Sequence, residues 1–358
     1  MDKTEIGKLL KQLVEVDGPS GVEAPVAAVI QALAKDLAQE ARVDALGSVI
    51  LRKSGAEKPA GRIMLAAHMD EIGLIVTKVE GGFLHVGEVG DAVARGLLGQ
   101  EVTVYPTGPG AEKWPNGLTG YIGGRPPHML TNDERKKVTP LGDLRVDLGL
   151  ASAEMVRVGD RAVARGPYTE LLGGHVATKA LDNRAGVAAM LAALGYLAGM
   201  KHDWDVYAVA TVQEEVGLFG ALTSAFGVAP DIAIAIDVTF GATPGLSEAE
   251  TVAMDKGPAI GWGPNMHPGI VKRLREAGDA LEIPYVNEPI SGGSGTDGWA
   301  IQVTREGIPT GLTSIPIRYM HSPVEMAALA DIDRTARLLA TFISRLDASV
   351  LAAMLEEV

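Results

Sequence analysis

The sequence predicts an α/β domain that carries an inserted β-domain. From about residue 166 to the C-terminus, helical and strand-like segments alternate, which is typical of a sheet with helices on its faces. Between about residues 72 and 165 the chain has short β-like runs punctuated by glycine and no convincing helix. A chain of 358 residues also exceeds what one compact core usually holds. We therefore expect a mostly parallel or mixed sheet with a small β-barrel or sandwich inserted into its chain.

The N-terminal part is expected to supply helices and the first strands. Residues 1–16 place apolar residues at helical spacing between charges, whereas a secretory signal needs an uninterrupted apolar stretch. Residues 22–39 repeat the helical spacing, and the apolar runs in residues 43–53 and 61–68 are strand-like. The segment is therefore interpreted as mature sequence in which helices lead into strands.

The second half of the chain continues the alternation. A helix is expected over Asn183–Gly199, a strand over residues 206–212, a helix over residues 218–226 and a strand over residues 232–237. A further helix is expected from Asp331 onwards. This order predicts helices on both faces of the sheet.

Composition excludes several classes of function. Lys+Arg 32 against Asp+Glu 45 gives a net charge of −13, which offers no field to attract nucleic acid. With no cysteine, any metal must be held by imidazole and carboxylate groups, which suits zinc, cobalt or manganese. The most apolar helical run, residues 184–200, opens on a charge and is followed by charged residues, so we expect a buried helix and no membrane span.

Five acidic or imidazole signals stand where apolar strands end or helices begin. Open α/β sheets bind their ligands at the carboxyl ends of their strands, so these positions are expected to meet. The signals are His68 with Asp70, Asp182, the pair Glu214 and Glu215, Asp237, and His321.

His68 and Asp70 follow an apolar run and stand two residues apart. In an extended segment such side chains point the same way, so Asp70 can accept the second ring N–H of His68 and leave the other nitrogen for a metal. Taken alone, a hydrogen-bonded structural histidine explains the pair better.

Glu214 and Glu215 directly follow a predicted strand. Adjacent side chains of an extended chain point to opposite sides, so one carboxylate can bind metal while the other acts as a general base. The alternative is a solvated strand end. It is less attractive because a glycine and an apolar helix follow at once.

Each of the remaining signals has an ordinary alternative. Asp182 stands at the expected start of a helix, where an N-cap is the better explanation when it is considered by itself. Asp237 closes a buried strand, where a carboxylate is costly unless it is paired, capped or bound to metal. His321 lies in an expected loop and taken alone is an ordinary surface residue. The other five histidines lack an acidic partner at a useful spacing and are expected in loops or on the surface.

Together the signals have the composition of a two-metal hydrolytic site. Three carboxylates carry −3 and two divalent ions carry +4, and a hydroxide balances the remainder. In such sites the ions lie about 3.5–4 Å apart and activate a water. Glu214 remains free to take the proton of that water and pass it to the leaving amine. The expected ligands are His68, Asp182, Glu215, Asp237 and His321.

At these residues the chain resembles the tetrahedral or glutamyl-aminopeptidase type of metallo-aminopeptidases, a family that also includes deblocking aminopeptidases and members labelled endoglucanases. Seven motifs in order carry the resemblance over nearly the whole chain. They are AHMDEIG at 67–73, GYIGGRPPH at 120–128, KALDNRAG at 179–186, VQEEVG at 212–217, IAID at 234–237, GTDG at 295–298 and IPIRYMHSPVE at 315–325.

The resemblance implies an architecture and an assembly. It implies a three-layer α/β/α metallopeptidase domain made of residues 1–70 and 166–358, with a small β-barrel dimerisation domain in residues 71–165. It also implies a cytoplasmic homo-oligomer, in which dimers assemble into a tetrahedral dodecamer, and peptide substrates with a free N-terminus.

The resemblance also implies a role for each matching residue. His68 and Asp237 would hold one divalent metal ion, Glu215 and His321 the other, and Asp182 would bridge the two. Zinc is expected, with cobalt or manganese as alternatives. Glu214 would be the general base and Asp70 would orient His68, and the peptide bond between Asp182 and Asn183 would be cis. The chain has Gly298 where the family pattern has alanine, which leaves the side-chain preference of the substrate pocket open.

Three other readings stay open at this point. Another two-metal amidohydrolase, such as a carboxypeptidase or an N-acyl amino acid deacylase, would activate water in the same way and differ only in how it holds the substrate. A glycosidase would need paired carboxylates without a metal. An inactive shell-forming scaffold is the third, but a scaffold has no physical reason to keep a complete set of ligands.

Overall fold

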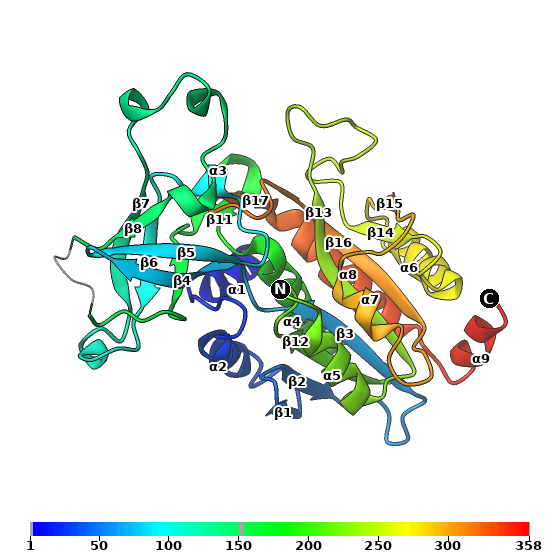
Figure 1. Cartoon of the computed structure of the whole chain (residues 1–358). Coiled ribbons are helices and arrows are strands. Elements are labelled where there is room, and N and C mark those ends of the chain that lie inside the picture. Colours follow the sequence, from blue (N-terminus) through cyan, green and yellow to red (C-terminus); the bar gives the residue numbers. More distant parts are fainter. Residues whose placement is uncertain (1–2, 150–153, 358) are drawn as a thin grey trace.

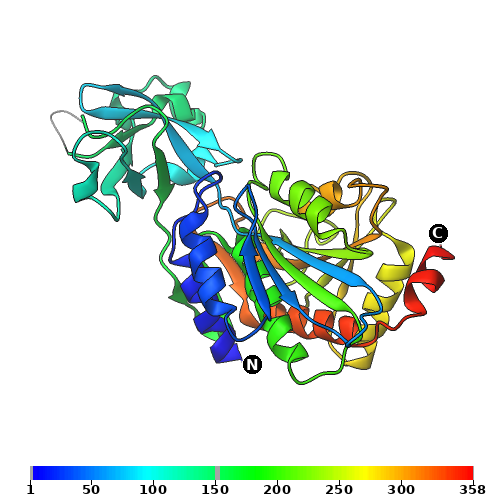
Figure 2. The ribbon, with the colours of Figure 1, turned by 90° about the horizontal axis from the view of Figure 1, so that it is seen from below.

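A computed structural model describes residues 3–149 and 154–357. The chain forms a layered α/β domain with a closed β-barrel at one end (Figure 1). Seen from below, the barrel projects away from the sheet and helices of the larger domain (Figure 2). The predicted fold class, an α/β domain with a small β-barrel, is therefore confirmed.

The α/β domain contains a mixed sheet of eleven strands within the described residues. Its strands are β1 (Glu40–Val43), β2 (Val49–Lys53), β3 (Arg62–His68), β10 (Thr169–Glu170), β11 (His175–Thr178), β12 (Asp205–Thr211), β13 (Ile232–Phe240), β14 (Ala259–Trp262), β15 (Val286–Pro289), β16 (Thr310–Arg318) and β17 (Glu325–Ala328). The order is β1-β2-β12-β3-β13-β16-β17-β11-β10. Strand β14 pairs with β16 of this series, and β15 pairs with β14. The central strands β12, β3, β13 and β16 are parallel, which brings their carboxyl ends to one edge.

Helices cover both faces of this sheet. They are α1 (Lys3–Val14), α2 (Ala24–Leu33), α4 (Leu181–Leu197), α5 (Phe219–Val228), α6 (Pro268–Ala280), α7 (Asp297–Ile301), α8 (Leu329–Ser344) and α9 (Val350–Leu355). One apolar core joins α1, α4, α6 and α8 to the sheet, and a second joins α5 and α7 to the opposite face. The three-layer α/β/α prediction is therefore confirmed.

Burial explains why the sequences of β3 and α4 are so apolar. Strand β3 is buried at every position after Arg62, because helices cover both of its faces. Helix α4 is buried on nearly all sides, between the sheet and α8, which explains its Ala- and Leu-rich composition. Among the described residues, no helix combines the length and the apolar character that a membrane crossing requires.

The barrel closes in the order β4-β5-β8-β7-β6-β9. Alternating side chains such as Val102 and Val104 fill its core. All six strands lie within the expected insertion, residues 71–165, and its use for dimerisation stays a prediction. The strands are β4 (Gly73–Glu80), β5 (Phe83–Val89), β6 (Glu101–Tyr105), β7 (Leu118–Gly123), β8 (Arg145–Asp147) and β9 (Arg161–Ala164), with a short helix α3 (Ala94–Leu97) that the sequence did not predict. Short 3-10 turns are η1 (Ala111–Lys113), η2 (Pro127–Met129), η3 (Glu134–Lys136), η4 (Leu141–Asp143) and, outside the barrel, η5 (Leu172–Gly174).

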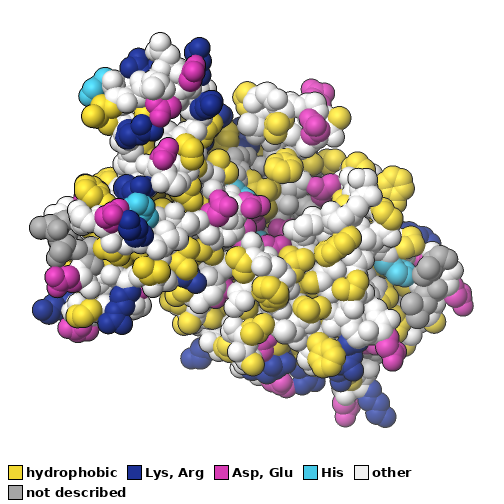
Figure 3. Space-filling view, viewed as in Figure 1, with side chains coloured by type: hydrophobic (Ala, Val, Ile, Leu, Met, Phe, Trp, Pro, Cys, Tyr) yellow, Lys and Arg dark blue, Asp and Glu magenta, His cyan; other side chains and the backbone are white. Residues whose placement is uncertain are grey.

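The barrel leaves the sheet at the edge where the carboxyl ends of the parallel strands meet. Strand β3 ends at His68, and after four residues the chain enters β4 of the barrel. The junction of the two domains therefore adjoins the expected site, and Figure 3 shows Asp and Glu side chains gathered in the hollow between them.

Candidate metal centre

His68 lies at the end of β3 with its two ring nitrogens facing different carboxyl groups. Its Nε2 is 3.0 Å from Asp182 Oδ1, and its Nδ1 is 3.5 Å from Asp70 Oδ1. The Asp70 backbone oxygen lies 3.3 Å from the same Nδ1. His68 and Asp70 are both buried. Asp70 thus stands beside the ring, as the spacing of the two residues predicts.

Asp182 connects the two histidines of the site. Its Oδ1 faces His68, and its Oδ2 lies 3.3 Å from His321 Nε2. The expected cis peptide bond between Asp182 and Asn183 is present. The alternative that Asp182 caps helix α4 is wrong, because the Asn183 side chain performs this role and accepts the N–H of Gly186 at 3.1 Å.

Glu214 and Glu215 reach different histidines. Glu214 Oε2 is 3.9 Å from His68 Nε2, whereas Glu215 Oε2 is 3.6 Å from His321 Nε2. The two side chains diverge as expected. The prediction attributed this divergence to an extended chain, but the structure gives another cause. The chain is not extended here, since Gln213 has a left-handed backbone (φ 55°) and starts a turn toward α5. The turn sends the two carboxylates in different directions.

Asp237 and His321 complete the set. Asp237 Oδ1 is 3.9 Å from His68 Nε2, and the side chain is buried. The expectation that Asp237 closes its strand is wrong, because β13 continues to Phe240 in parallel pairing with β16. His321 lies in the loop between β16 and β17, as expected, and has a left-handed backbone (φ 60°). The backbone N–H of His321 donates a hydrogen bond to Glu325 Oε1 at 2.8 Å, and this bond fixes the loop.

The structure brings all five expected ligands together and fits a metal centre. Two groups of side chains each have ligand atoms within 4.8 Å of one another. One group is His68, Glu214 and Asp237, and the other is His68, Asp182 and Glu215. Their donors are imidazole nitrogen and carboxylate oxygen, which suit zinc, cobalt or manganese. The assignment of each ligand to one ion stays a prediction.

The electrostatics show how crowded the carboxylates are. Burial raises the pKa of Glu214 to about 10, and the nearby Asp237 adds to this effect against the opposing charge of His68. Burial also raises the pKa values of Glu215 and Asp237 well above their usual range, and the carboxylate of Asp182 raises both further. Without a metal the ionised forms of these carboxyl groups are therefore disfavoured, and a bound cation would favour them.

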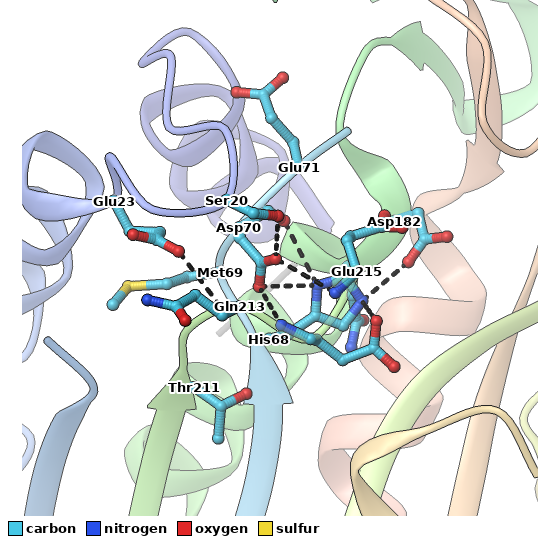
Figure 4. Close-up of polar contacts among 12 residues, drawn as sticks. Ser20, Glu23, His68, Met69, Asp70, Glu71, Asp182, Thr211, Gln213 and Glu215 are labelled. Carbon is cyan, nitrogen blue, oxygen red and sulfur yellow. Dashed lines mark hydrogen bonds and ion pairs between the residues drawn. The ribbon is translucent and has the colours of Figure 1, made fainter. Parts of the chain in front are cut away.

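Asp70 is the point where the segments of the site are tied together (Figure 4). Its carboxylate accepts the backbone N–H groups of Glu214 and Glu215 at 3.1 and 3.2 Å. It also accepts the Ser20 hydroxyl at 2.7 Å, and it faces His68. One buried carboxylate therefore orients an imidazole and fixes the backbone of both glutamates.

Three functional side chains were not predicted as such. Glu325 accepts the N–H groups of Asp182 and His321, and burial raises its pKa to about 8. Asp297 is buried beside the site, where it accepts the Thr211 hydroxyl at 2.6 Å. Both stand within motifs of the family resemblance, residues 295–298 and 315–325, and these motifs are their only signal in the sequence. Ser20 has no such signal.

Three of the remaining histidines differ from the expectation. His85 Nε2 lies 3.3 Å from Glu80, and His175 Nε2 lies 3.5 Å from Asp255, so both have the acidic partner that sequence spacing did not reveal. His267 precedes α6, and its ring nitrogens are buried without a hydrogen-bond partner among the described residues. Among the described residues, none of these three histidines belongs to the ligand groups given above.

Comparison with known proteins agrees with this geometry. Residues 47–338 match the M42 glutamyl aminopeptidase family. The lysyl aminopeptidase of Pyrococcus furiosus is 35% identical over 92% of this chain and 94% of that protein.

Solved structures give the same result. The aminopeptidase APDkam598 from the archaeon Desulfurococcus kamchatkensis has a TM-score of 0.89 and 38% identity over 98% of both chains. The TET1 peptidase of Pyrococcus horikoshii, described as able to assemble into a tetrahedron or a large octahedral shell, has a TM-score of 0.81 and 32% identity over 95% of this chain and 100% of that chain. Because the family match covers most of the chain and these relatives are similar along nearly their whole length, this chain belongs to the M42 glutamyl aminopeptidase family, whose members are metal-dependent aminopeptidases.

Proposed function

We propose that this chain is a two-metal aminopeptidase that hydrolyses the N-terminal peptide bond of peptides, with Glu214 as general base. The observation that carries the proposal is the position of Asp182, whose two carboxylate oxygens lie 3.0 and 3.3 Å from His68 and His321. A carboxylate in this position offers one oxygen to each of two ions. His68 and Asp237 would hold one ion and Glu215 and His321 the other, with Asp182 shared.

The side chains around these ligands suit hydrolysis. When bound, two such ions lower the pKa of a water and polarise the scissile carbonyl. Glu214 is not needed as a ligand in this arrangement and lies 3.9 Å from His68. Its carboxylate takes the proton of the attacking water and passes it to the leaving amine. Asp70 holds the backbone of Glu214 and so keeps its carboxylate directed at the site.

We further propose that the chain works as a homo-oligomer. The barrel projects from the α/β domain (Figure 2), and its surface is the one that we propose for dimerisation. The TET1 relative is described as assembling into closed shells, and a tetrahedral dodecamer is the state that we propose here. Light scattering tests this directly. A single species of the 37.3 kDa chain mass would contradict it.

The aminopeptidase proposal is tested with aminoacyl-nitroanilides that have a free N-terminus. The protein is first treated with a chelator, and hydrolysis is measured before and after adding zinc, cobalt or manganese. We expect metal-restored release from free substrates and none from their N-acetylated forms. Hydrolysis of only the acetylated forms would indicate a deacylase, and a folded protein that is silent with every metal would indicate an inactive scaffold.

A further inference from the structure

Strand β13 continues beyond Asp237 and carries a second polar side chain on the same face. Thr239 stands two residues after Asp237, and side chains two apart in a strand point the same way. At about 3.3 Å per residue, Thr239 lies roughly 7 Å farther along the strand than Asp237. Thr239 is buried. The wall of the metal site therefore extends past its ligands.

Glu288 lies on this extension of the site. The Thr239 hydroxyl donates a hydrogen bond to Glu288 Oε1, although Glu288 belongs to β15. The other carboxylate oxygen, Oε2, is buried and has no hydrogen-bond partner among the described residues. Within the described chain, no Lys, Arg or His pairs with Glu288 either. The Glu288 side chain is half-buried, and a ligand that brings a positive charge would pair with its unpartnered oxygen.

The chain after Glu288 leads directly to the base of the site. Strand β15 is followed by a glycine-rich loop that ends at Asp297, the first residue of α7. Asp297 accepts the hydroxyl of Thr211, which lies beside His68 in the parallel pairing of β12 and β3. Residues 288–297 therefore link the Glu288 carboxylate to the floor of the metal centre.

We infer that Glu288 recognises the cationic side chain of an N-terminal lysine or arginine in the substrate. The inference rests on the proposed aminopeptidase function, and it names the substrate class of the same site. The family description names glutamyl and a relative is named for lysyl residues, so family membership alone does not decide the preference.

Distance favours the side chain of the substrate over its α-ammonium group. The α-amine is attached to the carbon next to the scissile carbonyl, so it must stay beside the metal ligands. Glu288 contacts Thr239, about two strand residues beyond Asp237. Lysine carries its charge on a four-carbon stem, which spans such a gap. The net charge of −13 also favours the approach of cationic substrates.

The first experiment needs only the wild-type, metal-loaded protein. Binding of L-lysine and L-norleucine is compared by calorimetry, because norleucine has the same four-carbon stem without the charge. We expect lysine to bind at least about tenfold more tightly, as for a charge-assisted hydrogen bond. Equal binding of the two amino acids would overturn the inference, and this result does not depend on whether any variant folds.

The second experiment compares the kcat/KM values of lysyl, arginyl, leucyl and glutamyl nitroanilides. Glu288→Gln keeps the side-chain volume and removes the charge. We expect a loss of about 10-fold to 100-fold on lysyl and arginyl substrates, mostly in KM, and little change on leucyl substrates. Glu306→Gln makes the same charge change at an exposed position and should leave the preference intact.

The outcomes separate this inference from the proposed function. An equal loss of activity on all substrates would mean that Glu288 holds the α-ammonium or only supports the fold, and would overturn the inference. So would a preference for leucine that Glu288→Gln leaves unchanged. That result would point instead to the pocket lined by Ile72, Leu74 and Leu97 beside the metal site. In both cases the aminopeptidase proposal would stand. Silence of the wild type on every substrate and metal would overturn both.

Discussion

The Ser20 hydroxyl donates a 2.7 Å hydrogen bond to Asp70 Oδ2, and both side chains are buried (Figure 4). The same Asp70 oxygen accepts the backbone N–H of Glu215, while its other oxygen faces His68 and accepts the N–H of Glu214. A residue that precedes the site by fifty positions thus sets the rotation of the carboxylate that organises it.

Ser20→Ala should therefore weaken metal binding without unfolding the protein. Side chains that hold metal ligands in orientation without binding the metal are important for affinity. The loss of such a side chain typically costs about 10-fold to 100-fold in metal affinity. The measurement is the zinc dissociation constant by competition with a chelating dye, together with the melting temperature of the metal-free protein. Ser20→Thr keeps the hydroxyl and is the matched control. An unchanged zinc affinity in Ser20→Ala would show that the hydrogen bond has no role in positioning Asp70.

Glu214→Gln should retain metal and lose most of its activity. The amide keeps the size of the side chain but cannot take a proton from water, and general-base catalysis typically contributes about 100-fold to 10,000-fold. Metal content and kcat are measured on the same preparation. Glu215→Gln is the comparison, since it should lower metal content as well as activity. Wild-type turnover by Glu214→Gln would show that another group is the base.

The ligand assignment predicts different metal contents for two variants. Asp182→Ala should lose affinity for both ions, because its two oxygens face both histidines. His321→Ala should retain one ion, because the ligands on the His68 side remain. Elemental analysis after dialysis counts the ions, and His128→Ala, in a 3-10 turn of the barrel segment, is the control. One ion in Asp182→Ala and none in His321→Ala would reverse the proposed arrangement.

The residues of the site were more predictable from sequence than its geometry. The motifs and the rule that parallel strands end at one edge predicted that the five residues would lie together, and the structure brings them together. Their role as metal ligands stays a prediction. The turn at Gln213 and the continuation of β13 past Asp237 were not predictable, because long-range packing decides them. Glu288 is a stronger case, since it stands 49 residues from Thr239 and contacts it only in the folded chain, where β15 pairs with β14.

Asp331 should make the stability of the protein depend on pH. The residue is buried at the start of α8, and burial raises the pKa of its carboxyl from 3.8 to about 6. Between these two values the folded state binds more protons than the unfolded state, so the free energy of unfolding falls as pH rises through this window. The total decrease in the free energy of unfolding, which is reached above pH 6, is at most about 3 kcal/mol.

Urea unfolding of the metal-free protein at pH values from about 4 to 7 tests this prediction. Asp331→Asn removes the titrating group, so the decline attributed to Asp331 should disappear from the curve of the variant and should appear in the difference between variant and wild type. Asp36→Asn changes an exposed carboxylate and should follow the wild-type curve. Parallel curves for Asp331→Asn and wild type would mean that other buried groups cause the pH dependence.

Glu71 should be among the most costly side chains to remove outside the metal ligands. It follows Asp70 at the junction of the two domains and pairs with two buried cations. Lys179 Nζ lies 2.6 Å from Glu71 Oε2, and Arg184, which is completely buried, donates to Glu71 Oε1 at 2.9 Å. Glu71→Gln would leave both cations short of a counter-charge, and breaking a buried pair in this way typically costs about 3–5 kcal/mol.

The matched control is Glu80→Gln, which removes an exposed partner of Lys78. Both variants lose one glutamate charge from an ion pair, but water still solvates Lys78, so we expect no measurable change for the control. Urea unfolding of the metal-free forms compares the two. A small effect of Glu71→Gln would mean that Asp17, 3.0 Å from Lys179, together with the backbone oxygens that Arg184 contacts, already compensates both cations. In that case Glu71→Gln combined with Asp17→Asn should show the loss that Glu71→Gln alone does not.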